Sequence, residues 1–285
     1  MHTPVLLSKV TEGLNISQNG LYIDATVGEG GHLWEIAKLG GNVLAIDWDE
    51  EQIANIRKQI AKSEYREKVK PVVGNFADLA KIAKSNNFYP VDGVLFDLGL
   101  SIDQMQKSAR GFSYKNLKEP LDMRISLDLD KSAADIVNNF DQNQIYEILA
   151  NFSEEINSLA ISRAIVRARS LKDVNTVGDL VGIVNRSIGY KDTRVQARVF
   201  QALRIAVNNE LENLKKGLAQ AFTILKDNSR LVAISFHSLE DRIVKQFIKN
   251  NAFELKQLNK KVIRSDRGKR FERSAKLRIV QVKKL

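Results

Sequence analysis

The chain contains no cysteine, and this absence removes several classes of chemistry at once. Disulfide bonds, cysteine-ligated zinc, iron–sulfur centres and thiolate nucleophiles are all excluded. The three histidines, His2, His32 and His237, lack the spacing of metal ligands, so the sequence assigns no metal-binding residue and leaves metal dependence open. Any chemistry must therefore depend on carboxylates, hydroxyls, single histidines or an organic cofactor.

Proline, aromatic residues and long apolar runs are also scarce. There are 4 prolines and 7% aromatic residues in 285 positions, and no window approaches the roughly 18 apolar residues of a membrane-spanning helix. Residues 1–10 lack the charged region and cleavage pattern of a signal peptide, so we expect a cytoplasmic protein. A chain that is 44% hydrophobic and 27% charged is typical of a folded protein, here of roughly two domains.

Acidic residues are scarce at only one end of the chain. Residues 241–285 contain 15 Lys and Arg against 4 Asp and Glu, whereas residues 1–240 contain 29 against 30. The C-terminal segment therefore carries the whole net charge of +10 and predicts a polyanionic partner. No amphipathic-helix stripe accompanies these charges, so nucleic acid is a better candidate than a membrane. Apolar residues that alternate over 277–282 indicate a strand, so this segment also packs.

The first hundred residues alternate short apolar runs with helical patterns, which predicts an α/β fold with a parallel sheet. The expected strands are residues 21–27, 42–48, 69–74 and 91–98, and the expected helices are 32–39, 50–65 with Asp49 as N-cap, and 79–84. Residues 108–205 are turn-rich and then helical. A strand over 230–238, a helix over 239–250 and further strands within 253–285 follow. We therefore predict one domain from residues 1–107 and 206–285, interrupted by an inserted helical domain of residues 108–205.

A glycine turn and an acid together define a candidate cofactor site. The first strand runs into Gly28-Glu29-Gly30-Gly31-His32, where the backbone at a helix N-terminus can approach a ligand closely. Asp47 ends the second strand, 19 residues after Gly28, where it can accept hydrogen bonds from both hydroxyls of a ribose. NAD and S-adenosylmethionine both fit this pair. However, Leu33 stands where the dinucleotide fingerprint has Gly or Ala beneath a pyrophosphate, which favours the sulfonium cofactor.

Two more acids end predicted strands beside this turn. Asp24, with Glu29, offers acceptors for the ammonium of a sulfonium cofactor, and Asp97 ends the fourth strand. Open α/β sheets bind their ligands outside the carboxyl ends of the strands. We therefore expect Asp24, Asp47 and Asp97 to face one site.

Several long stretches of the chain resemble a known family. They are residues 2–7 (HTPVLL), 22–32 (YIDATVGEGGH), 96–99 (FDLG), 110–113 (RGFS), 121–124 (LDMR), 198–208 (RVFQALRIAVN) and 234–242 (ISFHSLEDR). The chain resembles the bacterial S-adenosylmethionine-dependent methyltransferases that modify N4 of a cytosine in the decoding region of 16S ribosomal RNA. The resemblance implies a Rossmann-like class I methyltransferase domain that is interrupted by a helical domain for substrate recognition.

The resemblance also implies a set of cofactor contacts. By matching position they fall on Gly30, Gly31, His32, Asp47, Phe76, Asp97 and Gln104, and Phe76 would give the adenine an apolar face. The chain departs from the family after residues 97–99, where it reads Leu-Ser-Ile-Asp before Gln104 in place of a Ser-Ser-Pro run. The stretch after Asn250 is also shorter than usual.

Catalysis of this kind depends on alignment and on proton acceptors, because the exocyclic nitrogen of cytosine is a weak nucleophile. Asp97 is the first candidate acceptor and Ser101 the second. His237 is a candidate for the released proton or for an RNA contact. No Pro-Pro-aromatic motif follows the fourth strand, so Phe112, Tyr114 or Phe236 would have to stack the target base.

The implied partner is 16S ribosomal RNA or the small ribosomal subunit, and the protein itself would be a monomer or homodimer that does not contact a membrane. The candidate RNA contacts are basic residues of the insert and of the C-terminal part, namely Arg163, Arg167, Arg194, Arg198, Arg204, Arg242, Arg267, Lys269 and Arg270.

Three other functions fit parts of the sequence. An NAD-dependent dehydrogenase would share the fold, but Leu33 and the basic C-terminal segment disfavour it. A non-catalytic RNA-binding or ribosome-assembly protein would need the basic segment but not Asp47 and Asp97. A methyltransferase acting on a small molecule would have no use for the basic segment.

Overall fold

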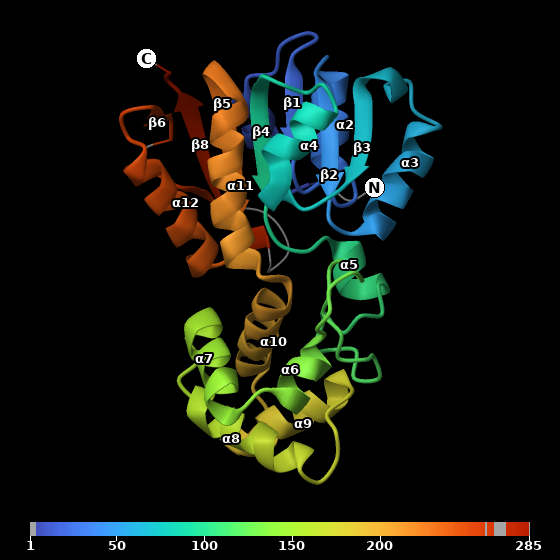
Figure 1. Cartoon of the computed structure of the whole chain (residues 1–285), viewed down its shortest axis with the longest axis vertical. Helices are drawn as coiled ribbons and strands as arrows, with labels where there is room; N and C mark the ends of the chain where they lie inside the picture. Colours follow the sequence, from blue (N-terminus) through green and yellow to red (C-terminus); the bar gives the residue numbers. More distant parts are fainter. Residues whose placement is uncertain (1–3, 260, 265–271, 285) are drawn as a thin grey trace. The chain divides into compact units, whose positions relative to one another are not determined.

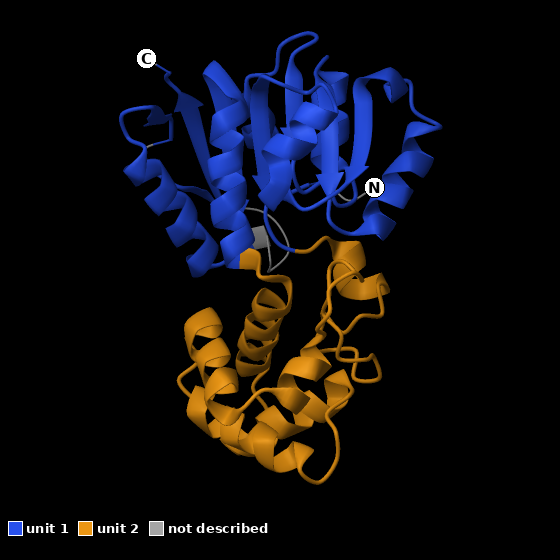
Figure 2. Cartoon of the chain, in the orientation of Figure 1, with its two compact units in different colours: residues 1–99, 211–285 blue, residues 100–210 orange. Residues whose placement is uncertain are grey.

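The computed structural model describes residues 4–259, 261–264 and 272–284. The chain divides into two compact units, one of Met1–Gly99 and Leu211–Leu285 and one of Leu100–Glu210 (Figure 2). The helical unit begins at residue 100 rather than at 108 and ends at 210 rather than at 205, because helices α5 (Ile102–Lys107) and α10 (Thr193–Asn208) both belong to it. Among the described residues, no helix combines the length and the apolar composition that a bilayer span requires.

The first unit is built on a mostly parallel sheet (Figure 1), as the sequence predicts. The parallel strands are β3 (Val69–Val73), β2 (Asn42–Asp47), β1 (Leu21–Asp24), β4 (Val91–Asp97) and β5 (Leu225–Ser235), in that spatial order. Strand β8 (Lys276–Val282) then pairs antiparallel with β5, and the short strands β6 (Leu255–Gln257) and β7 (Ile263–Arg264) pair with β8. The basic C-terminal segment therefore supplies the antiparallel strands of the sheet.

Some element ends differ from the predictions for local reasons. Strand β1 stops at Asp24 rather than at 27, because the Asp24 side chain accepts a hydrogen bond from the backbone N–H of Thr26 and turns the chain. Helix α3 (Glu50–Ile60) stops before residue 65, because the chain closes into tight turns after it. Strand β5 starts earlier than 230, because Leu225 already pairs with β4.

Helices bury both faces of the sheet in this unit. Helices α1 (Leu7–Leu14), α2 (Gly31–Lys38) and α3 contribute to one apolar cluster, and α4 (Leu79–Ser85), α11 (Glu210–Ile224) and α12 (Ser238–Asn250) contribute to the other. The central strands are accordingly apolar along almost their whole length. Since both faces are covered, the ends of the strands are where polar side chains can meet a ligand.

The second unit is helical and has its own apolar core. Its further helices are α6 (Ala133–Asn139), α7 (Gln142–Ser153), α8 (Ser158–Arg169) and α9 (Val177–Ile188). Capping boxes begin α6, α7 and α9, so side chains satisfy backbone N–H groups that a helix start leaves unpaired.

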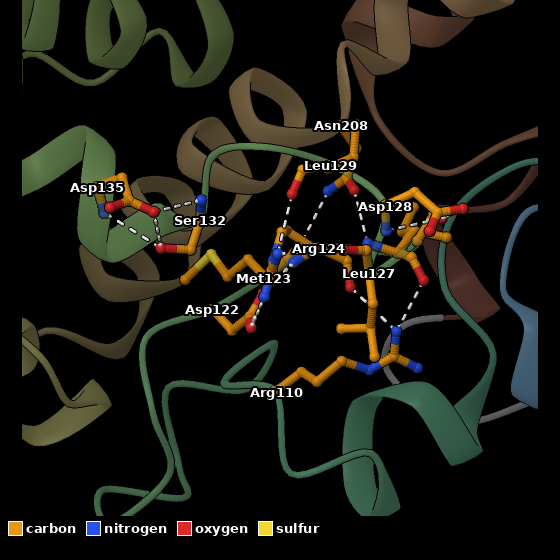
Figure 3. A network of polar contacts seen from close by, with 12 residues as sticks. Arg110, Asp122, Met123, Arg124, Leu127, Asp128, Leu129, Ser132, Asp135 and Asn208 are labelled. Atoms are coloured by element: carbon orange, nitrogen blue, oxygen red, sulfur yellow. Dashed lines mark hydrogen bonds and ion pairs between the residues drawn. The ribbon is translucent and has the colours of Figure 1, made fainter.

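A polar network fixes the irregular segment before α6 (Figure 3). Arg110 Nη1 donates to the carbonyl oxygens of Arg124 and Ile125, at 3.0 and 2.7 Å. The fully buried Asn208 accepts from the N–H of Ile125 at 2.7 Å and donates to the carbonyl of Met123 at 2.8 Å. Three of the stretches that resemble the methyltransferase family therefore meet in one network, which ties the irregular segment to α10.

Candidate active site

Four side chains form a row along the carboxyl edge of the sheet. Asp47, Asp24 and Asp97 are the last residues of β2, β1 and β4, which are neighbours in that order. Phe76 begins the short 3-10 helix that follows β3, at the next position in the same direction. Because these strands are parallel, the row runs Phe76, Asp47, Asp24, Asp97. The strand order therefore places the three acids along one edge of the sheet, and their service in one site stays a prediction.

The glycine turn lies beside this row and is tied to it. Gly28 and Gly30 adopt left-handed backbone conformations, with φ of 47° and 86°, which glycine accommodates without strain. Asp47 Oδ2 accepts the N–H of Gly28 at 2.9 Å, and its Oδ1 accepts the N–H of Asp49 at 2.9 Å. Burial raises the pKa of Asp47 to about 6, although these backbone N–H groups oppose the shift. Asp47 therefore connects β2 to the turn that follows β1.

Thr26 links two of the acids, a role that the sequence analysis missed. Its N–H donates to Asp24 Oδ1 at 3.3 Å, and its Oγ1 accepts the N–H of Asp97 at 2.7 Å. His32, in the first turn of α2, places Nε2 at 3.4 Å from Asp97 Oδ2. Asp24, Asp97 and His32 thus form one connected polar group.

The titration behaviour of this group is shifted by its burial. Asp24 is 1% exposed, and burial raises its pKa to about 7. Burial lowers the pKa of His32, but the carboxylate of Asp97 and the charge of Asp24 outweigh it and raise that pKa above its usual value. The carboxylates at this edge therefore offset the effect of burial on the pKa of His32.

The same group leaves hydrogen-bonding capacity unused. Within the described part of the chain, both ring nitrogens of His32 and Asp97 Oδ1 are buried and lack a partner with hydrogen-bond geometry. Buried polar atoms without partners are costly, so they mark places that a polar ligand completes. A ligand with both donors and acceptors fits this end of the row.

Phe76 presents an aromatic ring at the other end of the row. Its ring meets Phe96 edge to face, with centroids 5.6 Å apart. It also packs on Gly217 of α11, where a Cβ atom would lie 2.6 Å from Phe76 Cδ2. Two neighbours therefore fix the orientation of the Phe76 ring, which remains partly exposed.

Comparisons with known proteins identify the family of this chain. A model of the MraW methylase family matches residues 1–283. The chain belongs to this family. A ribosomal RNA small subunit methyltransferase H from Thermomicrobium roseum is 46% identical over 256 residues, covering 88% of this chain and 78% of its own. A protein of the same name from Coprothermobacter proteolyticus is 42% identical over 287 residues, covering 98% of this chain and 95% of its own.

The solved structures that resemble this member of the MraW methylase family support the fold alone. A putative rRNA methylase from Clostridium thermocellum superposes with a TM-score of 0.51 at 11% identity, covering 100% of this chain and 99% of its own. An rRNA methylase from Streptococcus thermophilus superposes with a TM-score of 0.50 at 9% identity, again covering 100% and 99%. The Rossmann-like fold predicted from the sequence is confirmed.

Three residues predicted to act in the site are used as helix caps in this MraW family member. Ser101 and Gln104 form the capping box of α5 in the helical unit. His237 caps α12, where its Nδ1 accepts the N–H of Glu240 at 3.4 Å and its Nε2 lies 3.1 Å from Glu240 Oε1. The caps account for the positions of these side chains, and their roles in proton transfer or cofactor binding stay predictions.

The predicted RNA contacts fall into three groups. Arg163, Arg167, Arg194 and Arg242 are exposed, although Arg194 pairs with Asp192 at the start of α10. Arg198 and Arg204 instead form ion pairs within the helical unit, with the buried Glu155 and with Glu210, at Nε–O distances of 2.7 Å. Arg267, Lys269 and Arg270 lie outside the described residues. Arg198 and Arg204 are therefore weaker candidates for RNA binding than the sequence suggests.

One of the three aromatic residues considered for base stacking remains a good candidate. Phe112 is buried in the core of the helical unit, and the Tyr114 ring packs on Phe200 with centroids 6.2 Å apart. Phe236 follows directly after β5 and lies next to Gly99, which follows β4. Because β5 neighbours β4, Phe236 extends the row beyond Asp97.

We predict that Asp24→Asn changes the pH dependence of stability. Between its unfolded pKa near 3.8 and its folded pKa of about 7, Asp24 binds its proton more tightly in the folded state. Wild-type protein should therefore lose stability as the pH rises through this window, by ~2–3 kcal/mol between about pH 5 and 8 from this group. The asparagine variant lacks this contribution, so its unfolding free energy should fall less over the same range.

Denaturant unfolding followed by tryptophan fluorescence measures this effect, because Trp34 and Trp48 are the protein's two tryptophans and both lie in the first unit. Asp78→Asn is the matched control, since Asp78 is an exposed acid of the same unit. Equal pH slopes for wild type and Asp24→Asn would contradict the raised pKa.

Proposed function

We propose that this protein transfers a methyl group from S-adenosylmethionine to N4 of a cytosine in the decoding region of 16S ribosomal RNA. The names of the relatives support ribosomal RNA of the small subunit as the substrate. The observation that carries the cofactor assignment is the order of side chains along the carboxyl edge of the sheet. The edge carries first an aromatic ring, then an acid suited to ribose hydroxyls, and then two acids with a histidine. The cofactor has its adenine, its ribose and its amino acid end in the same order.

Each part of the row has a physical reason to hold its part of the cofactor. Phe76 offers an apolar ring face to adenine. Each carboxylate oxygen of Asp47 accepts one backbone N–H, from Gly28 or from Asp49. The remaining lone pairs on these oxygens would accept hydrogen bonds from the ribose hydroxyls. Asp24 attracts the ammonium group, and Nδ1 of His32, the ring nitrogen that does not face Asp97, suits the carboxylate. The bound cofactor would supply a methyl group that its sulfonium charge activates.

Asp97 and Phe236 are assigned to the target base. Asp97 Oδ1 is unpartnered among the described residues and would accept a proton from the cytosine amino group as that nitrogen forms its new bond. Phe236, at the end of the adjacent strand, would support the face of the ring. Since Nδ1 of His237 is used by the α12 cap and its Nε2 lies against Glu240 Oε1, Asp97 is the better acceptor.

The helical unit is assigned to RNA recognition and the other unit to cofactor binding. Arg163 and Arg167 are exposed on α8, one helical turn apart, so both face the same side of that helix. Together with the basic C-terminal segment they would contact phosphates, whose attraction weakens as salt rises.

Replacing Asp97 should separate methyl transfer from cofactor binding. Asp97→Asn keeps the shape of the side chain but removes its negative charge, so we expect methylation to fall at least ~100-fold. The affinity for S-adenosylhomocysteine should fall much less. Small ribosomal subunits without the modification are incubated with each protein, and N4-methylcytidine in the 16S RNA is measured by mass spectrometry. Calorimetry gives the affinity.

Asp78→Asn, an exposed acid outside the row, is the matched control and should retain full activity. If Asp97→Asn methylates at the wild-type rate, the role assigned to Asp97 is wrong. If wild-type protein forms no N4-methylcytidine, the proposed function is wrong.

Loss of two arginines from α8 should weaken RNA binding specifically. We expect Arg163→Ala/Arg167→Ala to lower the affinity for 16S RNA about tenfold and to reduce the slope of log affinity against log salt by about 1–2. The control is Arg57→Ala/Lys58→Ala, which removes the same charge from the exposed surface of α3. Filter binding over a salt series measures both, and equal losses for the two variants would refute a specific role for α8.

A further inference from the structure

Gly31 is a glycine for reasons of space rather than backbone conformation. Unlike Gly28 and Gly30, it does not have a positive φ, so a larger residue could adopt its backbone angles. A Cβ atom on Gly31 would instead lie 2.9 Å from Cγ of Pro4, 3.0 Å from its Cβ and 3.1 Å from its Cδ. These atoms belong to a rigid five-membered ring that cannot rotate away. The Pro4 ring therefore packs directly on the backbone at the start of α2.

Pro4 is itself held by the segment that follows it. Val5 and Leu6 pack against the apolar cluster that includes Val27 and Leu33, which flank the glycine turn. Leu6 is the N-cap residue of α1, whose Val10 and Leu14 are buried against the sheet. The contact with Gly31 therefore joins two parts of a packed core.

The glycine turn is also supported from its other flank. A Cβ atom on Gly30 would lie 2.7 Å from Cδ1 of Ile56 in α3. Gln59 of the same helix accepts a hydrogen bond from Trp34 Nε1 at 2.8 Å and donates to the carbonyl of Glu29 at 3.5 Å. Helix α3 and Pro4 thus restrain adjacent residues of the same turn.

We propose that Pro4 is a positioning residue of the cofactor site, which acts by holding the turn of residues 28–32 in the conformation that binds S-adenosylmethionine. The inference rests on the proposed function, because it concerns the same site. Pro4 acts through Gly31, and its contribution lies in pre-organising a turn whose residues would otherwise lose conformational freedom on binding. It also gives a role to the described part of the HTPVLL stretch, which the proposed reaction leaves without one.

A double-mutant cycle tests this coupling. Gly31→Ala alone should weaken the binding of S-adenosylhomocysteine at least tenfold, because the new methyl group and the Pro4 ring push the turn out of place. Pro4→Gly alone should weaken it several-fold, because the support is lost. In the double variant the clash is absent, so its affinity should return to about that of Pro4→Gly.

Calorimetry measures the affinities, and tryptophan fluorescence during unfolding of each unliganded variant measures the stability of the first unit. Ser8→Gly is the control for added flexibility in the same segment, since Ser8 is exposed on α1. It should bind like wild type. A readout on affinity matters here, because a contact that merely stabilised the fold would change unfolding and leave the affinity of the folded protein unchanged.

The outcomes separate the two claims. Independent, multiplicative losses in the double variant, or a wild-type affinity for Pro4→Gly, would overturn the positioning role. The second result remains decisive if Gly31→Ala does not fold. If wild-type protein does not bind S-adenosylhomocysteine, the proposed function fails with the inference, whereas wild-type binding without coupling removes only the role of Pro4.

Discussion

The parallel pairing of four strands is the constraint on which the site depends. Asp24 and Asp97 lie 73 positions apart in the sequence, and Asp47 is between them. They meet because β2, β1 and β4 are neighbours that run in one direction, so their carboxyl ends share one edge. Helices bury both faces of the sheet and leave this edge as the place where polar groups can face a ligand.

The site carries a cost in stability that the rest of the first unit offsets. Burial raises the pKa values of Asp24 and Asp47 to about 7 and 6, which means that the ionised forms are disfavoured without a ligand. Nδ1 of His32, which is buried without a hydrogen-bond partner among the described residues, adds to this cost. Such a cluster is expected where a cation with further polar groups binds, because the ligand supplies what the protein leaves incomplete. The surrounding core supplies the stability that these groups do not.

The sequence predicted the features that depend on local pattern. Parallel strands appear as short apolar runs, and Asp49 appears as the N-cap that it is. The three acids could be placed on one edge because each one ends an apolar run. The family resemblance added candidate residues such as Phe76, which no local pattern marks, whereas the strand order that aligns them comes from the structure.

The features that the sequence did not predict depend on distant partners. Arg198 pairs with Glu155 over 43 positions, and no local pattern distinguishes such an arginine from a free one. The roles of Ser101 and His237 as caps follow from where their helices begin, which sequence locates poorly. The contact of Pro4 with Gly31 depends on the packing of α1 against α2. These are tertiary effects, and periodicity carries no information about them.

The most direct test of the account is a crystal structure of the protein with S-adenosylhomocysteine bound. We predict that the adenine contacts the Phe76 ring, that the ribose hydroxyls donate to Asp47, and that the amino acid end lies at Asp24 and His32. Density for the ligand at another place, or in the reverse order along this edge, would contradict the assignment of the row.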